Sequence, residues 1–197
     1  MNASLRIAIA DDEPRMREYL WSCLNRLGHQ VVCGAKTGRE LIEQCLKQRP
    51  DLIIADIKMP DMDGIAAIGE IARHQVIPAI LMTGFDDAEY IERATRQPVL
   101  AYLVKPVKEQ ALAPAIAIAV ERFREIQALR KEAADWKQAL EDRKLIERAK
   151  GIIMKRSGLD EPEAFRRLQA LASRKSRKLV DIAAAIATAE EVYTPEA

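Results

Sequence analysis

The chain has 197 residues, of which 49% are apolar and 31% are charged, and its formal net charge is +1. This composition is typical of a globular protein and excludes a disordered or low-complexity chain. Because no run of 18 or more apolar residues occurs, we expect no membrane-spanning helix. The first residues, "MNASLRIAIADDEP", pass directly from a short apolar segment to acidic residues, so we expect no cleaved secretory leader and predict a cytoplasmic protein.

Short apolar, β-branched runs alternate with helix-like segments through the first hundred residues. Alternation of this kind builds a parallel sheet that is covered by helices on both faces. We therefore predict that residues 1–122 form an α/β domain with an open, doubly wound, five-stranded parallel sheet. The predicted strands are residues 5–10, 30–34, 52–56, 77–83 and 99–104, and the predicted helices between them are residues 15–27, 38–48, 65–73 and 87–97.

A long helical pattern begins at Lys108 and contains a coiled-coil seam. Apolar positions within residues 123–140 are spaced 3, 4, 3 and 4 residues apart, which is the spacing of the contact positions of a coiled coil. The seam could pack on its own chain, but a helix that leaves a compact domain with such a seam favours pairing with a second copy, so we predict a homodimer. The seam residues are Ile126, Leu129, Ala133, Trp136 and Leu140.

The last segment, residues 141–192, is predicted to form three short helices. The first contains "LIERAKGIIMKR" and ends near Gly158, which suits a turn. The second begins at a capping-box-like pair, Asp160 and Glu163. We expect Ser176 to cap the start of the third helix.

Positive charge is concentrated in this segment. Residues 136–178 contain 13 Lys and Arg against 6 Asp and Glu, whereas residues 1–124 contain 16 against 17. One basic helix face can simply be solvated, but basic residues on several consecutive helices favour a polyanionic partner. The candidate contacts are Arg143, Lys144, Arg148, Lys150, Lys155, Arg166, Arg174, Lys175, Arg177 and Lys178.

Polar residues follow four of the predicted strands. The carboxyl ends of parallel strands meet at one edge of the sheet, where ligands bind, so these side chains should converge. A cluster of carboxylates is favourable only with a cation, and oxygen ligands open to water suit Mg²⁺. A nearby lysine and hydroxyl would bind the oxygens of a phosphoryl group, so the cluster fits a carboxylate that accepts one. Its members are Asp11, Asp12, Asp56, Thr83 and Lys105.

The motifs "IADDEP", "ADIKMPDMDG", "TGF" and "YLVKP" resemble the receiver domain of bacterial two-component response regulators. This resemblance implies a flavodoxin-like fold, a sensor histidine kinase as partner and a phosphoacceptor that is not otherwise an enzyme. It also implies the role of each site residue. Asp56 would be the phosphoacceptor, Asp11, Asp12, Asp56 and the backbone carbonyl of Lys58 would hold Mg²⁺, Thr83 and Lys105 would bind the phosphoryl oxygens, and Tyr102 would be the switch aromatic.

The C-terminal segment resembles the ANTAR domain, a three-helix RNA-binding module of transcription antitermination regulators. The resemblance is carried by "RKLIERAKGIIM", "EAFRRL" and "KLVDIA". It implies that a dimer binds paired RNA stem-loops so that a terminator hairpin cannot form. The alternative is a DNA-binding response-regulator transcription factor, because three short helices can also form a helix-turn-helix. Residues 125–197 contain no arrangement of nucleophile and base that would indicate an enzyme.

Overall fold

The computed structural model describes residues 4–84, 92, 94–95 and 97–193. Most of the helix expected at residues 87–97 therefore lies outside the described residues. The chain divides into two compact units, Met1–Gln127 and Ala128–Ala197, which are described in turn.

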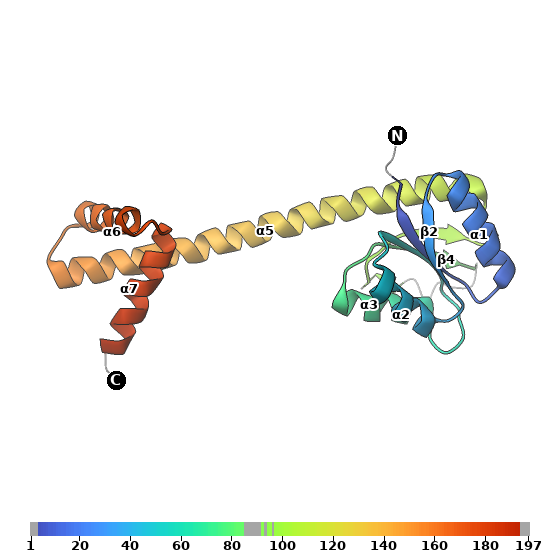
Figure 1. Ribbon diagram of the computed structural model, residues 1–197, viewed down its shortest axis with the longest axis horizontal. Coiled ribbons are helices and arrows are strands. Elements are labelled where there is room, and N and C mark those ends of the chain that lie inside the picture. The colour runs from blue at the N-terminus through green and yellow to red at the C-terminus, as the bar shows by residue number, and fades with distance from the viewer. Residues whose placement is uncertain (1–3, 85–91, 93, 96, 194–197) are drawn as a thin grey trace. The chain divides into compact units, whose positions relative to one another are not determined.

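The first unit is built on a five-stranded parallel sheet, as predicted (Figure 1). Its strand order is β2-β1-β3-β4-β5, so the direction of chain progression reverses between β1 and β3. In open α/β sheets this reversal marks the crevice in which ligands bind. The strands are β1 (Arg6–Ala10), β2 (Gln30–Ala35), β3 (Leu52–Asp56), β4 (Ala79–Thr83) and β5 (Val99–Val104).

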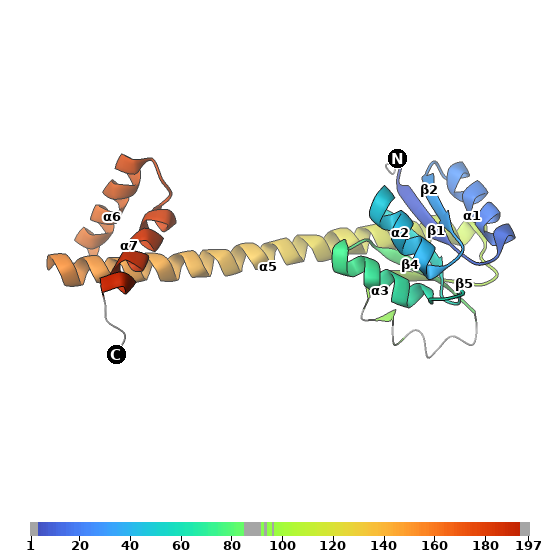
Figure 2. The same ribbon diagram turned by 60° about the horizontal axis from the view of Figure 1, so that its bottom comes forward.

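Helices cover both faces of this sheet (Figures 1 and 2). The helix α1 (Pro14–Arg26) and the first turns of α5 (Glu109–Ser157) pack on one face. The helices α2 (Gly38–Gln48) and α3 (Gly64–His74) pack on the other. The starts of α2 and α3 are fixed by capping side chains, as Thr37 accepts a hydrogen bond from the Glu40 amide and Asp63 from the Ala66 amide.

The long helix α5 differs from the prediction in one respect. The structure has no break near residue 140, so the first helix of the C-terminal segment is the end of α5 and not a separate short helix. The physical reason is that residues 115–150 contain neither glycine nor proline, and helix-favouring Glu, Arg, Lys and Leu fill the expected junction. The helix ends where expected, at Ser157, and the next residue, Gly158, has a φ of +67°. Among the described residues, no helix is both long and apolar enough to cross a membrane.

The second unit packs α6 (Glu161–Lys175) and α7 (Leu179–Tyr193) on the C-terminal part of α5 (Figure 2). The predicted capping box is present, because the Asp160 carboxylate accepts from the Glu163 amide and the Glu163 carboxylate accepts from the Asp160 amide. The core residues of this unit are Ala149, Ile153, Ala164, Leu168, Ala172, Ile182 and Ala183.

The predicted role of Ser176 is wrong. Ser176 does not cap the start of α7 but ends α6 in the left-handed conformation, with a φ of 51°. An N-terminal cap would need an extended backbone instead. Its amide donates to the carbonyl of Ser173 at 3.1 Å, which closes the last turn of α6.

Candidate functional site

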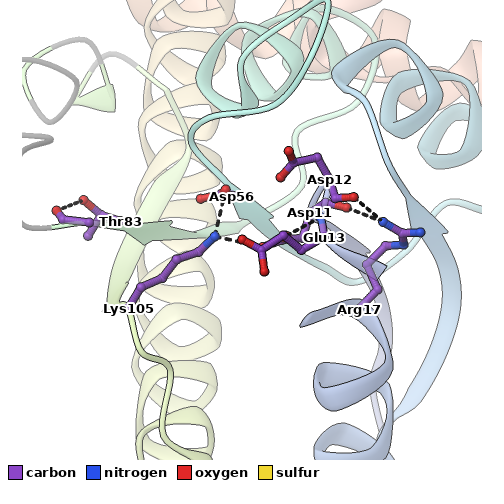
Figure 3. Close-up of polar contacts among 8 residues, drawn as sticks. Asp11, Asp12, Glu13, Arg17, Asp56, Thr83 and Lys105 are labelled. Carbon is purple, nitrogen blue, oxygen red and sulfur yellow. Dashed lines mark hydrogen bonds and ion pairs between the residues drawn. The ribbon is translucent and has the colours of Figure 1, made fainter. Parts of the chain in front are cut away.

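Three carboxylates gather where β1 and β3 end (Figure 3). Asp11 and Asp12 directly follow β1, and Asp56 is the last residue of β3. One carboxylate oxygen of each lies within 4.8 Å of those of the other two. Asp11 is fully buried and Asp56 is 7% exposed, whereas Asp12 is open to solvent. An oxygen-rich cluster with one open side fits a magnesium ion that keeps several of its waters.

The ammonium group of Lys105 lies between two of these carboxylates. Its Nζ is 3.0 Å from Asp11 Oδ2 and 2.8 Å from Asp56 Oδ2. Burial lowers the pKa of Lys105, but hydrogen bonds to Asp56 and Asp11 outweigh it, so the net shift is upward. Burial also raises the pKa of Asp56, and the neighbouring Lys105 opposes that shift. With one cation among three carboxylates, the site carries excess negative charge, which a divalent cation would neutralise.

The loop that carries Asp11 and Asp12 is fixed by hydrogen bonds from Glu13 and from Arg17 of α1. The Glu13 amide donates to Asp11 Oδ1 at 2.9 Å, and Arg17 Nη1 donates to the backbone carbonyls of Asp11 and Asp12 at 2.7 and 3.1 Å (Figure 3). Arg17 therefore positions the residues Asp11 and Asp12 through their backbone carbonyls. Sequence reasoning missed Arg17, because contact with carbonyl groups leaves no characteristic residue pair in the sequence.

The first turn of α3 lies against the backbone of Asp56. The Gly64 amide donates to the Ile57 carbonyl at 2.9 Å, and a Cβ on Gly64 would overlap the Asp56 carbonyl oxygen. Only glycine therefore lets α3 start this close to the end of β3. The sequence motif contained this residue, but its packing role becomes visible only in the structure.

The variant Gly64→Ala is expected to displace the backbone of Asp56 and to lower the free energy of unfolding by about 1–3 kcal/mol. Denaturant titration measures this loss. The matched control is Gly151→Ala, because a Cβ at Gly151 would meet no atom of the described residues within 4 Å apart from the adjoining helix backbone, and alanine favours a helix. A loss at Gly64 no larger than at Gly151 would contradict the close approach.

The remaining predicted site residues lie at the end of β4, within β5 and in the loop after β3. Thr83 ends β4, is buried, and donates from Oγ1 to the Gly84 carbonyl at 3.0 Å. The Lys105 amide donates to the Thr83 carbonyl at 2.8 Å, which ties the ends of β4 and β5 together. Tyr102 lies opposite Leu81 in the sheet and is 37% exposed. Lys58 is exposed two residues after Asp56.

Lys150, in the second unit, was predicted to be an exposed contact for a polyanion, but the structure buries its side chain. Its side chain is only 9% exposed, and its Nζ forms ion pairs with Glu161 at 2.6 Å and Glu147 at 2.9 Å. Hydrogen bonds to these two carboxylates raise the pKa of Lys150. The ammonium also lies 5.8 Å from the centre of the half-buried Phe165 ring. Lys150 therefore joins α5 to the start of α6, and its charge is already neutralised.

The other predicted contacts of the second unit are exposed, but two of them are also ion-paired. Arg148 Nη1 lies 2.8 Å from Glu191 Oε1, and Lys144 Nζ lies 2.8 Å from Glu141 Oε1. The remaining exposed candidates are Arg143, Lys155, Arg166, Arg174, Lys175, Arg177 and Lys178.

Comparison with known families gives two matches. The family model of the response regulator receiver domain matches residues 7–117, and that of the ANTAR domain matches residues 134–186. The transcriptional regulatory protein PdtaR of Mycobacterium tuberculosis is 44% identical over 164 residues, which cover 83% of this chain and 80% of PdtaR. The regulatory protein AtoC of Escherichia coli is 34% identical over 141 residues, which cover 71% of this chain and 30% of AtoC.

Solved receiver structures match the first unit. The REC domain of AraT, a response regulator from Geobacillus stearothermophilus, matches with a TM-score of 0.56 and 32% identity, covering 64% of this chain and 99% of that one. The signal receiver domain of a modulated diguanylate cyclase from Desulfovibrio desulfuricans matches with a TM-score of 0.57 and 27% identity, covering 61% of this chain and 96% of that one.

Proposed function

We propose that this chain, which belongs to the response regulators that join a receiver domain to an ANTAR domain, is a phosphorylation-controlled transcription antiterminator. It acts in the cytoplasm by binding paired RNA stem-loops. The observation that carries the proposal is that one chain combines two features. The buried carboxylate of Asp56 forms an ion pair with Lys105, and residues 136–178 of the helical second unit carry an excess of positive charge. The receiver domain spans residues 1–122, the coiled-coil segment residues 123–140 and the ANTAR domain residues 141–192.

In the receiver domain, Asp56 is the phosphoacceptor. A carboxylate oxygen of Asp56 attacks the phosphoryl group of a phosphohistidine on the partner kinase, so that the new O–P bond forms as the P–N bond breaks. Asp11, Asp12, Asp56 and the Lys58 carbonyl would hold Mg²⁺, which when bound would neutralise charge on the incoming phosphoryl oxygens.

Two further residues respond to the new group. Lys105 already contacts Asp56 at 2.8 Å and remains near the bound phosphoryl group to pair with one of its oxygens. Thr83 turns its hydroxyl from the Gly84 carbonyl to another phosphoryl oxygen, and Tyr102 follows as the switch aromatic. These movements are the local events that bias the receiver domain between two states.

The output is controlled through dimerisation along α5. Leu129, Trp136 and Leu140 lie on one seam and are 64%, 70% and 54% exposed. Apolar side chains at coiled-coil spacing are seldom left to water, and a second copy of the same helix covers them in register. Phosphorylation shifts the receiver domain toward this dimer, which brings two ANTAR domains onto two hairpins and adds avidity.

The double variant Leu129→Glu, Leu140→Glu is expected to be monomeric in sedimentation experiments, even with the phosphoryl donor present, because four carboxylates would face one another across the seam. The matched control is Ala134→Glu, Gln138→Glu, which adds the same charge at exposed positions off the seam and should still dimerise. If the wild-type chain is monomeric both with and without phosphorylation, the dimer proposal is wrong.

A competition between hairpin RNA and duplex DNA distinguishes RNA binding from the alternative, DNA binding. In a gel shift at one fixed salt concentration, the chain should prefer a tandem-hairpin RNA over duplex DNA of equal length. A preference for the duplex would favour a DNA-binding transcription factor instead.

A further inference from the structure

We propose that the phosphate backbone of the bound RNA docks on the basic junction, residues 173–178, which comprise the end of α6 and the turn that leads to α7. This inference rests on the RNA-binding function proposed above and names the surface that performs it. It also moves the main contact away from the basic face of α5, where five of the ten candidate residues lie.

The basic junction carries four cations and no carboxylate. Its sequence is "SRKSRK", and all six residues are exposed. Within the described part of the chain, none of the four basic side chains forms an ion pair. Like charges placed this close together repel one another, and a polyanion relieves that repulsion. The four cations are Arg174, Lys175, Arg177 and Lys178.

The basic residues of α5 are arranged differently. In addition to the pairs of Lys144, Lys150 and Arg148, Arg156 Nε lies 2.7 Å from Glu190 Oε2. A phosphate that approached these side chains would compete with carboxylates of the same chain and would meet their negative charge. The fold therefore neutralises much of the α5 face internally and leaves the charge of the basic junction available.

Hydrogen bonds also close the backbone of the basic junction. The Arg177 amide donates to the Ala172 carbonyl at 3.0 Å, and the Ser176 amide donates to the Ser173 carbonyl at 3.1 Å. The turn is anchored on both sides, because Ala172 lies in the core of the second unit and Leu179 packs against it. The cations thus extend from a fixed turn, so less conformational freedom is lost when they bind than from a flexible tail.

Contacts to phosphate give affinity and orientation but carry little sequence information. We therefore expect the basic junction to hold many RNAs of the same shape, while loop bases are read by other residues. Asp181, in the first turn of α7, is the nearest carboxylate along the chain and opposes the junction's charge.

The test compares two triple variants that each remove three positive charges. The junction variant is Arg174→Gln, Lys175→Gln, Arg177→Gln, and the control is Lys144→Gln, Arg148→Gln, Arg156→Gln. The affinity for a tandem-hairpin RNA is measured at several salt concentrations, and the unfolding transition of each variant is measured alongside.

Each lost phosphate contact should make the negative slope of log affinity against log salt less steep by about 0.7–0.9, so the junction variant should lower its steepness by about 2–3. The control should change it by less than about 1. The variant Asp181→Asn should raise RNA affinity a few-fold, a gain that misfolding cannot produce. Equal slopes for the junction variant and the wild type, or a larger change in the control, would overturn the proposal. If the wild type itself binds no hairpin RNA, the RNA-binding function fails and not merely this surface.

Discussion

The variant Lys105→Met is expected to lose about 3 kcal/mol of unfolding free energy at pH 7 without divalent cations. Methionine keeps much of the side-chain length but removes the charge that bridges Asp11 and Asp56. Asp11 is fully buried and Asp56 nearly so, so their like charges would then face each other with little solvent to screen them. Denaturant titration of the variant and the wild type measures the loss.

The electrostatic origin of this loss has a signature in pH. Burial already raises the pKa of Asp56, and removing Lys105 takes away the largest opposing influence. The folded variant then binds a proton more tightly than the unfolded chain, so its stability falls as pH rises above the ordinary carboxylate range. Lowering the pH toward 5 should therefore restore part of the lost stability.

Magnesium ions should also restore it, by replacing the missing positive charge. The control is Lys108→Met, an exposed lysine three residues further along the chain, which should change stability by less than about 0.5 kcal/mol. If the loss in Lys105→Met is the same at every pH and with Mg²⁺, the lysine contributes packing alone and the electrostatic account of the site is wrong.

The variant Asp56→Asn is expected to accept no phosphoryl group from a small-molecule phosphoryl donor, because an amide oxygen is not a nucleophile for this step. Phosphorylation is measured by the mobility shift of the intact chain on a phosphate-binding gel. The control Asp61→Asn, at an exposed loop position in the left-handed conformation that asparagine tolerates, should be phosphorylated normally.

The variant Asp56→Asn should remain folded, so its failure to be phosphorylated cannot be explained by unfolding. Because the folded-state pKa of Asp56 is raised, its charged form costs stability at neutral pH, so the neutral amide should be equally or more stable there. This gain should disappear below about pH 4, where the carboxylate of the wild type is protonated. Residual phosphorylation of a well-folded Asp56→Asn chain would mean that another residue is the acceptor.

The first unit was predictable because its signals are local and agree with one another. Apolar runs of five or six residues place each strand, and the topology of a parallel sheet then brings their carboxyl ends together without knowledge of any side-chain contact. Asp11, Asp56 and Lys105 converge for this reason, although they are distant in sequence. Arg17 escaped prediction because its partners are backbone carbonyls, which every residue possesses.

The second unit was less predictable because its differences depend on contacts between helices. The sequence cannot indicate that Lys150 is buried until α6 places Glu161 beside it, eleven residues further along the chain. Ser176 suits either end of a helix, and the packing of Leu179 against the core decides that α7 begins after it. The missing break in α5 follows from a simpler cause, since neither glycine nor proline lies in residues 115–150, which include the whole coiled-coil seam and the expected junction.

The measurement that tests the central claim most directly is the affinity for a tandem-hairpin RNA, with Mg²⁺ and at fixed salt, before and after treatment with a phosphoryl donor. We predict that phosphorylation raises the affinity of the wild type by about tenfold, a typical coupling between two sites, and leaves Asp56→Asn unchanged. An affinity that is the same in all four conditions would contradict control of RNA binding by Asp56.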